Sequence, residues 1–277
     1  MGKTTLAAED EAKLRAAATY NAASDSYDDP ANSFWARFGR NTVARLGLRR
    51  GDRVLDVCCG SGASALPAAQ AVGNEGGVLG VDLAERLLAL GRTKAAALGL
   101  SNIEFRSGDM LDLRQPAASF DAVLCVFGIF FVSDMATAVA ALWRLVRPGG
   151  RLAITTWGPR FLEPGTNAFW DSIRAVRPDL YRGFNPWDRI CDPPALRDLL
   201  RAGGVERAEV VAESARHPIA TPEAWWAAVQ GTGYRGTVEQ LAAPDFERVR
   251  ADNLEYVRRS GINAVEVNVV YAVAAKP

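Results

Sequence analysis

Between residues 53 and 157, short apolar runs of strand length alternate with longer segments of helical periodicity. Apolar runs bounded by Gly, Asp or Pro predict buried strands, and Ala- and Leu-rich stretches predict helices. The predicted strands are 53–59, 76–83, 102–109, 120–132 and 151–157. The predicted helices between them are 64–73, 84–99 and 134–147. Strands that alternate with helices over short connections predict a parallel, doubly wound α/β sheet.

Beyond residue 157 the alternation loosens, because Pro, Gly and aromatic residues become frequent. The predicted elements are partly helical structure in 158–190, a helix at 192–204, a strand at 208–214, helices in 221–261 and a long final strand at 264–276. With the first five strands, these two make a seven-stranded sheet that carries a helical cap.

These boundaries divide the chain into four parts. We predict a helical N-terminal arm or lid (1–50), a Rossmann-like cofactor-binding core (51–157), a cap insertion (158–190) and the rest of the sheet (191–277), which contains a helical insertion at 217–261. The arm and the two insertions flank the sheet. They are therefore expected to cover the crevice at the strand ends, where ligands bind in such folds.

Composition narrows the possible partners. Lys plus Arg and Asp plus Glu both number 32, so no bulk charge favours nucleic acid or an anionic membrane. The longest apolar run, 122–132, is 11 residues long and is too short to span a bilayer. The N-terminus lacks the apolar core of a signal peptide, so we expect a cytoplasmic protein without membrane or nucleic-acid partners, as a monomer or homodimer.

The four cysteines do not follow a metal-binding pattern. Cys58 and Cys59 are adjacent, whereas Cys125 and Cys191 lie far from them in sequence. This spacing matches no zinc motif, and a disulfide framework is not expected in a chain of 277 residues. We therefore predict reduced cysteines and no metal site.

A glycine loop follows the first predicted strand. Residues Gly60 to Ala65 spell G-x-G-x-x-A, which matches the dinucleotide-binding fingerprint. Glycines let the backbone turn and approach a ligand, and the helix that follows presents free N–H groups to a negative charge. A nicotinamide dinucleotide and the carboxylate of an amino acid would both suit such a loop.

Asp56, four residues before Gly60, distinguishes the two ligands. A carboxylate beside a pyrophosphate would repel it, whereas an α-ammonium group would be held through hydrogen bonds and bound water. The loop is thus expected to bind a zwitterion, and S-adenosylmethionine carries both charges.

At this point the sequence resembles the class I S-adenosylmethionine-dependent methyltransferases. Their motif D/E-x-G-x-G-x-G lies on Asp56, Cys58, Gly60 and Gly62. Cys58 replaces the first glycine, which predicts a φ below zero there, with room for a Cβ. A Cys or Ala at this place is similar to the ubiquinone and menaquinone biosynthesis methyltransferases. The resemblance also implies a Rossmann-like sheet whose last strand is antiparallel.

The resemblance assigns roles to two further strand-end acids. Asp82 is expected to accept hydrogen bonds from the ribose hydroxyls, and Asp109 from the adenine amino group, with the backbone N–H of Met110 on the ring. Helix capping is the alternative role for each acid. The implied cofactor-binding residues are Tyr27, Asp56, Cys58, Gly60, Gly62, Ala63, Asp82, Leu83, Asp109, Met110, Val126 and Phe127.

Catalytic residues are harder to identify, because methyl transfer is an in-line displacement that depends mainly on positioning. Tyr27 aligns with an arm tyrosine that closes over the cofactor in the resembling group, and plain packing is the alternative. His217, the sole histidine, is the candidate general base, with a solvated loop histidine as the alternative.

The acceptor pocket is predicted from aromatic residues in and beside the variable segments. The candidates are Tyr20, Phe130, Trp187 and Tyr234. Such walls would suit a small apolar or aromatic acceptor, methylated on C or O. Two other functions stay open: an NAD(P)-dependent oxidoreductase that uses the same loop, and a catalytically silent S-adenosylmethionine-binding protein.

Overall fold

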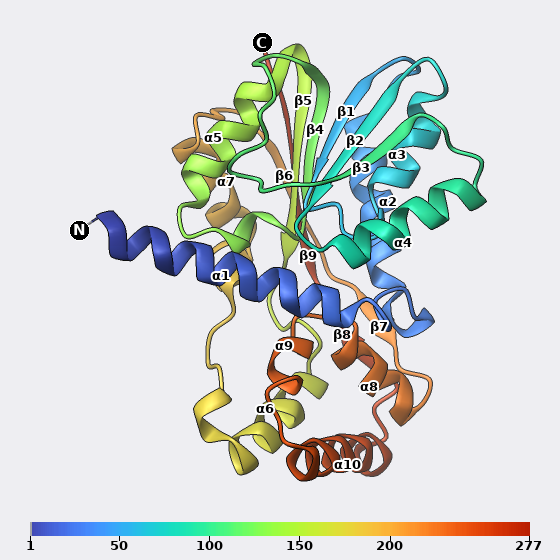
Figure 1. The fold of residues 1–277 in the computed structure, drawn as a ribbon, viewed down its shortest axis with the longest axis vertical. Helices are drawn as coiled ribbons and strands as arrows, with labels where there is room; N and C mark the ends of the chain where they lie inside the picture. The colour runs from blue at the N-terminus through green and yellow to red at the C-terminus, as the bar shows by residue number, and fades with distance from the viewer. Residues whose placement is uncertain (1) are drawn as a thin grey trace.

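The computed structural model describes residues 2–277, with side chains from residue 11 onward; Met1 and the side chains of residues 2–10, part of the predicted arm, lie outside the described residues. The strands of the main sheet are β1 (Arg53–Val57), β2 (Gly77–Asp82), β3 (Ile103–Ser107), β4 (Phe120–Val126), β5 (Val146–Trp157), β6 (Glu209–Glu213) and β9 (Val269–Ala275). Within the described residues this sheet has seven strands in the order β3-β2-β1-β4-β5-β9-β6 (Figure 1). It confirms the predicted sheet.

The strand directions also follow the prediction. The strands β1 to β5 pair in parallel, whereas β9 lies antiparallel between β5 and β6. The strand order reverses between β1 and β4. In open α/β sheets this is the place where a crevice opens at the carboxyl ends of the strands.

Helices cover both faces of the sheet. One face is covered by α2 (Phe34–Leu46), α3 (Ala65–Val72) and α4 (Glu85–Ala97). The other face is covered by α5 (Met135–Leu145) and α7 (Pro193–Ala202) (Figure 1). Neighbouring residues of β1 face opposite sides: Val54 packs with α2, α3 and α4, whereas Leu55 packs with α5 and α7. A strand buried on both faces accounts for its unbroken apolar run.

A helical cap lies beyond the carboxyl ends of the strands (Figure 1). Its elements are α6 (Gly165–Val176), α8 (Pro222–Gln230), α9 (Arg235–Val238) and α10 (Ala243–Ser260), joined to the sheet by the short strands β7 (Arg216–Pro218) and β8 (Ala264–Glu266). The N-terminal helix α1 (Gly2–Ala23) crosses between sheet and cap (Figure 1). The remaining short helices are η1 (Pro30–Asn32), η2 (Ile129–Phe131), η3 (Pro178–Leu180) and η4 (Pro186–Ile190).

Two predicted strands were wrong in detail. The long strand at 264–276 is broken into β8 and β9, because the side chain of Asn268 accepts the Ala215 N–H at 3.0 Å and its carbonyl accepts the Gly158 N–H at 2.7 Å. Those bonds tie the break to two loops. The strand predicted at 120–132 ends at Val126, because Phe127 adopts a φ of +56° and the chain continues into η2.

Candidate functional site

A cavity of about 750 Å³, open solvent at its mouth included, lies at the carboxyl ends of β1, β2, β3 and β4 and against α1. Its lining residues are Lys13, Ala16, Ala17, Tyr20, Tyr27, Trp35, Cys58, Gly60, Val81, Asp82, Leu83, Ala84, Leu87, Gly108, Asp109, Met110, Val126, Phe127, Phe131 and Val132. The cavity therefore occupies the predicted crevice and joins the N-terminal arm to the loops that follow four strands.

The glycine loop forms one wall of this cavity. Gly60 has a φ of +54°, and a Cβ built on it would lie 3.0 Å from the hydroxyl oxygen of Tyr27. Only glycine combines that backbone with the close approach of the tyrosine. Gly62 has a φ of +87°, but a Cβ there would meet Leu66 and Phe105, on the side away from the cavity.

Asp82 ties the glycine loop to the start of α4. Its carboxylate accepts the Gly60 N–H and the Ala84 N–H, each at 2.8 Å. Burial raises the pKa of this carboxyl above its ordinary value, against the effect of these hydrogen bonds. Because each carboxylate oxygen has a second lone pair, Asp82 can accept two further hydrogen bonds from a ligand.

Asp56 is placed differently from the prediction. Its side chain is fully buried under the glycine loop, where Ser64 donates its hydroxyl at 2.6 Å, and it is not among the described residues that line the cavity. Burial raises its pKa to about 7. The other oxygen, Oδ1, has no hydrogen-bond partner among the described residues, so the carboxylate keeps one acceptor that the protein does not satisfy.

Cys58 corrects another expectation. Its φ is +60°, in the left-handed region, whereas a negative value was predicted. The side chain lies over Gly128, where an added Cβ would come within 2.4 Å of the Cys58 Cβ. The missing side chain of Gly128 therefore gives Cys58 its room. The hydrogen bond with Cys125 and burial both raise the pKa of the Cys58 thiol, which keeps it protonated on the cavity wall.

At the opposite end of the cavity, Asp109 pairs with the arm. Lys13 of α1 donates to its Oδ2 at 2.7 Å, and the Leu111 N–H donates to its Oδ1 at 2.9 Å. Both side chains are about a quarter exposed, at 20% for Lys13 and 27% for Asp109. The arm is therefore anchored by charge to the rim where an adenine was predicted.

The arm tyrosines form an aromatic roof over the cavity. Tyr27 stacks on Trp35 with ring centroids 5.1 Å apart, and Tyr20 meets the edges of Tyr27 and Phe131. Burial is the largest cause that raises the pKa of both tyrosines, so their hydroxyls are protonated donors at neutral pH. They are suited to orienting a ligand rather than to removing a proton.

A polar latch holds this roof on the glycine loop. Asp28, next to Tyr27, accepts the Ser61 hydroxyl at 2.8 Å and the Lys94 ammonium at 2.9 Å. Lys94 also donates to Ser61 at 2.8 Å. The latch thus links the arm, the loop and α4.

His217 does not take the place predicted for a general base. Its Nε2 lies 2.9 Å from the Ala31 carbonyl oxygen, its ring packs edge-on against Phe34, and it is not among the described residues of the cavity wall. Burial lowers the pKa of this imidazole. It is a buried core histidine of β7 that packs against η1 and α2.

The other predicted residues divide between two places. Leu83, Met110, Val126 and Phe127 line the cavity, whereas Ala63 does not. Trp187 and Tyr234 pack inside the cap region. The ring centroid of Trp187 lies 5.4 Å from that of Phe130, and the Tyr234 hydroxyl forms a 3.0 Å hydrogen bond with the Thr166 hydroxyl.

A larger hollow, here called the outer groove, lies beside the cavity. It encloses about 2240 Å³, open solvent included. Its lining residues are Ala12, Arg15, Ala16, Ala18, Thr19, Tyr20, Ala22, Phe130, Phe131, Val132, Ser133, Met135, Arg182, Phe184, Pro186, Arg189, Gly233, Gly236, Thr237, Glu239 and Gln240. The two hollows adjoin, since Ala16, Tyr20, Phe131 and Val132 line both of them.

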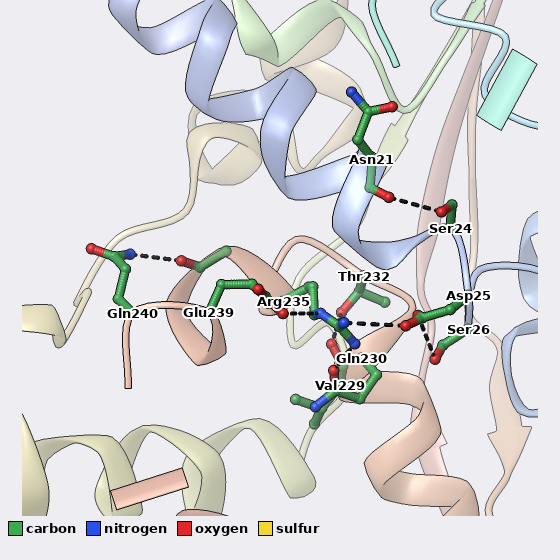
Figure 2. Close-up of polar contacts among 11 residues, drawn as sticks. Asn21, Ser24, Asp25, Ser26, Val229, Gln230, Thr232, Arg235, Glu239 and Gln240 are labelled. Carbon is green, nitrogen blue, oxygen red and sulfur yellow. Dashed lines mark hydrogen bonds and ion pairs between the residues drawn. The ribbon is translucent and has the colours of Figure 1, made fainter. Parts of the chain in front are cut away.

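Arg235 links α9 to the segment that follows α1 (Figure 2). Its guanidinium donates to Asp25 after α1 at 3.2 Å, to Glu239 at 2.6 Å and to the side-chain oxygen of Gln230. Because this side chain is only 17% exposed, the ion pairs are partly shielded from water. They hold α9 against the arm.

Sequence reasoning missed several cavity residues. Lys13 had no signal, since a lysine in an N-terminal helix is ordinarily solvated. Phe131 and Val132 were assigned to a strand that actually ends earlier. Trp35 of α2 packs in the core and also lines the cavity.

A family model described as a methyltransferase domain matches residues 54–150. The demethylmenaquinone methyltransferase of Geobacillus kaustophilus is 38% identical over 114 residues, which cover 41% of this chain and 49% of that protein. The chain thus spans about half the length of the curated relatives it matches.

Solved structures share the fold. The crystal structure of the cyclase SpnF superposes with a TM-score of 0.55 at 23% identity, over 87% of this chain and 80% of that one. A SAM-dependent methyltransferase from Aquifex aeolicus gives 0.53 at 22% identity, over 68% of this chain and 89% of its own. No helix among the described residues is long and apolar enough to cross a membrane.

Proposed function

We propose that this protein methylates a small molecule with S-adenosylmethionine as the methyl donor, because residues 54–150 match the model of a methyltransferase domain. The contact of Asp82, at the end of β2, with Gly60 of the glycine loop supports a site for a ribose diol, which a nicotinamide enzyme would also need. The observation that carries the proposal is therefore the unpartnered Oδ1 of the buried Asp56 under the same loop, because a carboxylate there suits an ammonium group and not a pyrophosphate.

The residues present fit the cofactor. In this proposal Asp82 accepts hydrogen bonds from the ribose hydroxyls. Asp109 accepts a hydrogen bond from the adenine amino group, and the Met110 N–H donates to the adenine ring. The unpartnered Oδ1 of Asp56 supports a contact, through water, with an ammonium group, which would lower the raised pKa of that carboxyl. The protonated Tyr27 hydroxyl above Gly60 donates to the methionyl end.

The cofactor supplies an electrophilic methyl group on a sulfonium. The protein's part is to exclude water and to align the acceptor: Trp35, Phe127 and Phe131 line the cavity with apolar rings. Among the described residues of the cavity wall there is no histidine, so the chain offers no imidazole base there. Catalysis by positioning is the form that these residues support.

The acceptor enters from the outer groove in this proposal. The groove adjoins the cavity at Tyr20 and Phe131, and an acceptor atom would approach the methyl group there in line with the breaking bond, from the side opposite the sulfur. The aromatic walls favour a flat, largely apolar acceptor, methylated on C or O. The name of the Geobacillus relative points to a quinone-related acceptor as one member of this class.

The test combines binding and turnover. Calorimetry with S-adenosylhomocysteine and with NADH separates a methyltransferase from the nicotinamide alternative. Radioactive methyl transfer to a panel of hydroquinones and phenols then separates an enzyme from a silent binder. This second step is needed because the cyclase SpnF has the same fold. Binding of NADH without S-adenosylhomocysteine would refute the proposal.

A further inference from the structure

The outer groove has a charge excess that the whole chain lacks. Acids and bases balance at 32 each over the sequence, yet the groove is lined by three arginines and one glutamate. That glutamate, Glu239, is bound to Arg235 at 2.6 Å. The side chains that line the groove therefore carry an excess of positive charge.

Two of the arginines are not neutralised by the protein. Arg15 pairs with Glu11 at 2.8 Å, whereas Arg182 and Arg189 bond to no carboxylate among the described side chains. Asp188, the neighbouring acid, turns its carboxylate to the Asn185 N–H at 2.7 Å. Two guanidinium groups thus face the groove with donors available to a ligand.

An aromatic surface lies beside these donors. Phe184 is 51% exposed, an unusual position for a large apolar ring, and the Arg189 guanidinium lies 5.5 Å from the centre of that ring. Phe130 and Phe131 supply apolar surface on another part of the groove wall. A planar ring would stack on such surfaces, while an attached anion would meet the guanidinium groups.

We propose that the acceptor of this enzyme is an aromatic carboxylate, held in the outer groove by Arg182 and Arg189 and reaching the cavity at Tyr20 and Phe131. The inference rests on the proposed function for its chemistry, but the binding step does not require methyl transfer. The negative charge of such an acceptor would also be drawn toward a sulfonium.

The experiment uses matched acids and amides. Hydroxybenzoate and hydroxynaphthoate, with the corresponding hydroxybenzamide and hydroxynaphthamide, are titrated by calorimetry into the whole chain, with and without S-adenosylhomocysteine. Each acid is expected to bind about tenfold more tightly than its amide, because a charge-assisted bond is lost in the amide. The preference should fall as salt is raised.

Variants assign the preference to the groove. Arg182→Gln with Arg189→Gln should lower acid affinity to that of the amide. Arg201→Gln, on α7 and paired with Asp198 at 3.3 Å, is the matched control and should leave the preference unchanged. Equal binding of acids and amides, no binding of either acid, or an unchanged preference in the double variant would overturn the inference.

The same titrations keep the two proposals apart. If S-adenosylhomocysteine binds and neutral phenols are methylated while acids show no preference, the acceptor inference fails and the methyltransferase stands. If acids bind through the two arginines but S-adenosylhomocysteine does not bind, the methyltransferase fails and the anion site stands.

Discussion

Replacing Gly60 by alanine adds a single carbon atom, the Cβ, to the cavity wall. The new Cβ would lie 3.0 Å from the Tyr27 hydroxyl, on a backbone with a φ of +54°. The left-handed conformation alone costs roughly 1–2 kcal/mol for a residue with a Cβ. The close approach to Tyr27 requires a shift of the tyrosine by only a few tenths of an ångström, so its effect falls on the ligand site and not on the free energy of unfolding.

Gly99 offers a matched control. It has a φ of +66°, but an added Cβ there would have no atom within 4 Å. Gly99→Ala therefore carries the backbone cost without the contact. Both variants should lose about 1–2 kcal/mol of unfolding free energy, or roughly 2–8 °C in melting temperature.

The two variants should differ only in ligand binding. We expect Gly60→Ala to weaken S-adenosylhomocysteine binding about tenfold or more, and Gly99→Ala to leave it within about twofold, which corresponds to a difference of at least about 1 kcal/mol. Isothermal calorimetry on both proteins measures this difference. Equal affinities would show that the Gly60 and Tyr27 contact is not part of the ligand site.

Three further predictions follow from the buried acids and the arm. Asp82→Asn should weaken binding of S-adenosylhomocysteine by about 2–4 kcal/mol through loss of charge-assisted bonds, and calorimetry showing no change would remove Asp82 from the site. Because burial raises the folded pKa of Asp56 to about 7, the folded state keeps a proton that the unfolded chain loses near pH 4. The contribution of this group to the free energy of unfolding, without ligand, should therefore fall by about 4 kcal/mol between pH 4 and 7. The amide that replaces the carboxyl in Asp56→Asn cannot titrate, so in urea unfolding the stability of this variant relative to the natural protein should rise by that amount over the same pH range. A parallel pH dependence of the two proteins would contradict this. Lys13→Met removes the partly exposed ion pair to Asp109, so stopped-flow release of bound S-adenosylhomocysteine should speed up a few-fold, whereas an unchanged rate would separate that ion pair from arm opening.

Local sequence chemistry determined the sheet and most of its helices. The apolar runs predicted the central parallel strands, because a strand buried on both faces is apolar throughout. The edge strand β3 buries only Phe105 and is less apolar. The acids Asp82 and Asp109 were found at the strand ends where the structure has them on the cavity wall. These features depend on near neighbours in the chain, and composition and spacing record them directly.

Only the tertiary structure decided which candidates meet. Asp56 shares with Val54 the face of β1 that packs on α3, so its carboxylate bonds to Ser64 under the loop instead of lining the cavity. Lys13 reaches Asp109 from 96 residues away. His217, chosen for its chemistry alone, lies against Ala31. The direction of a side chain and contacts between distant segments depend on how helices and sheet pack together, which local pattern does not contain.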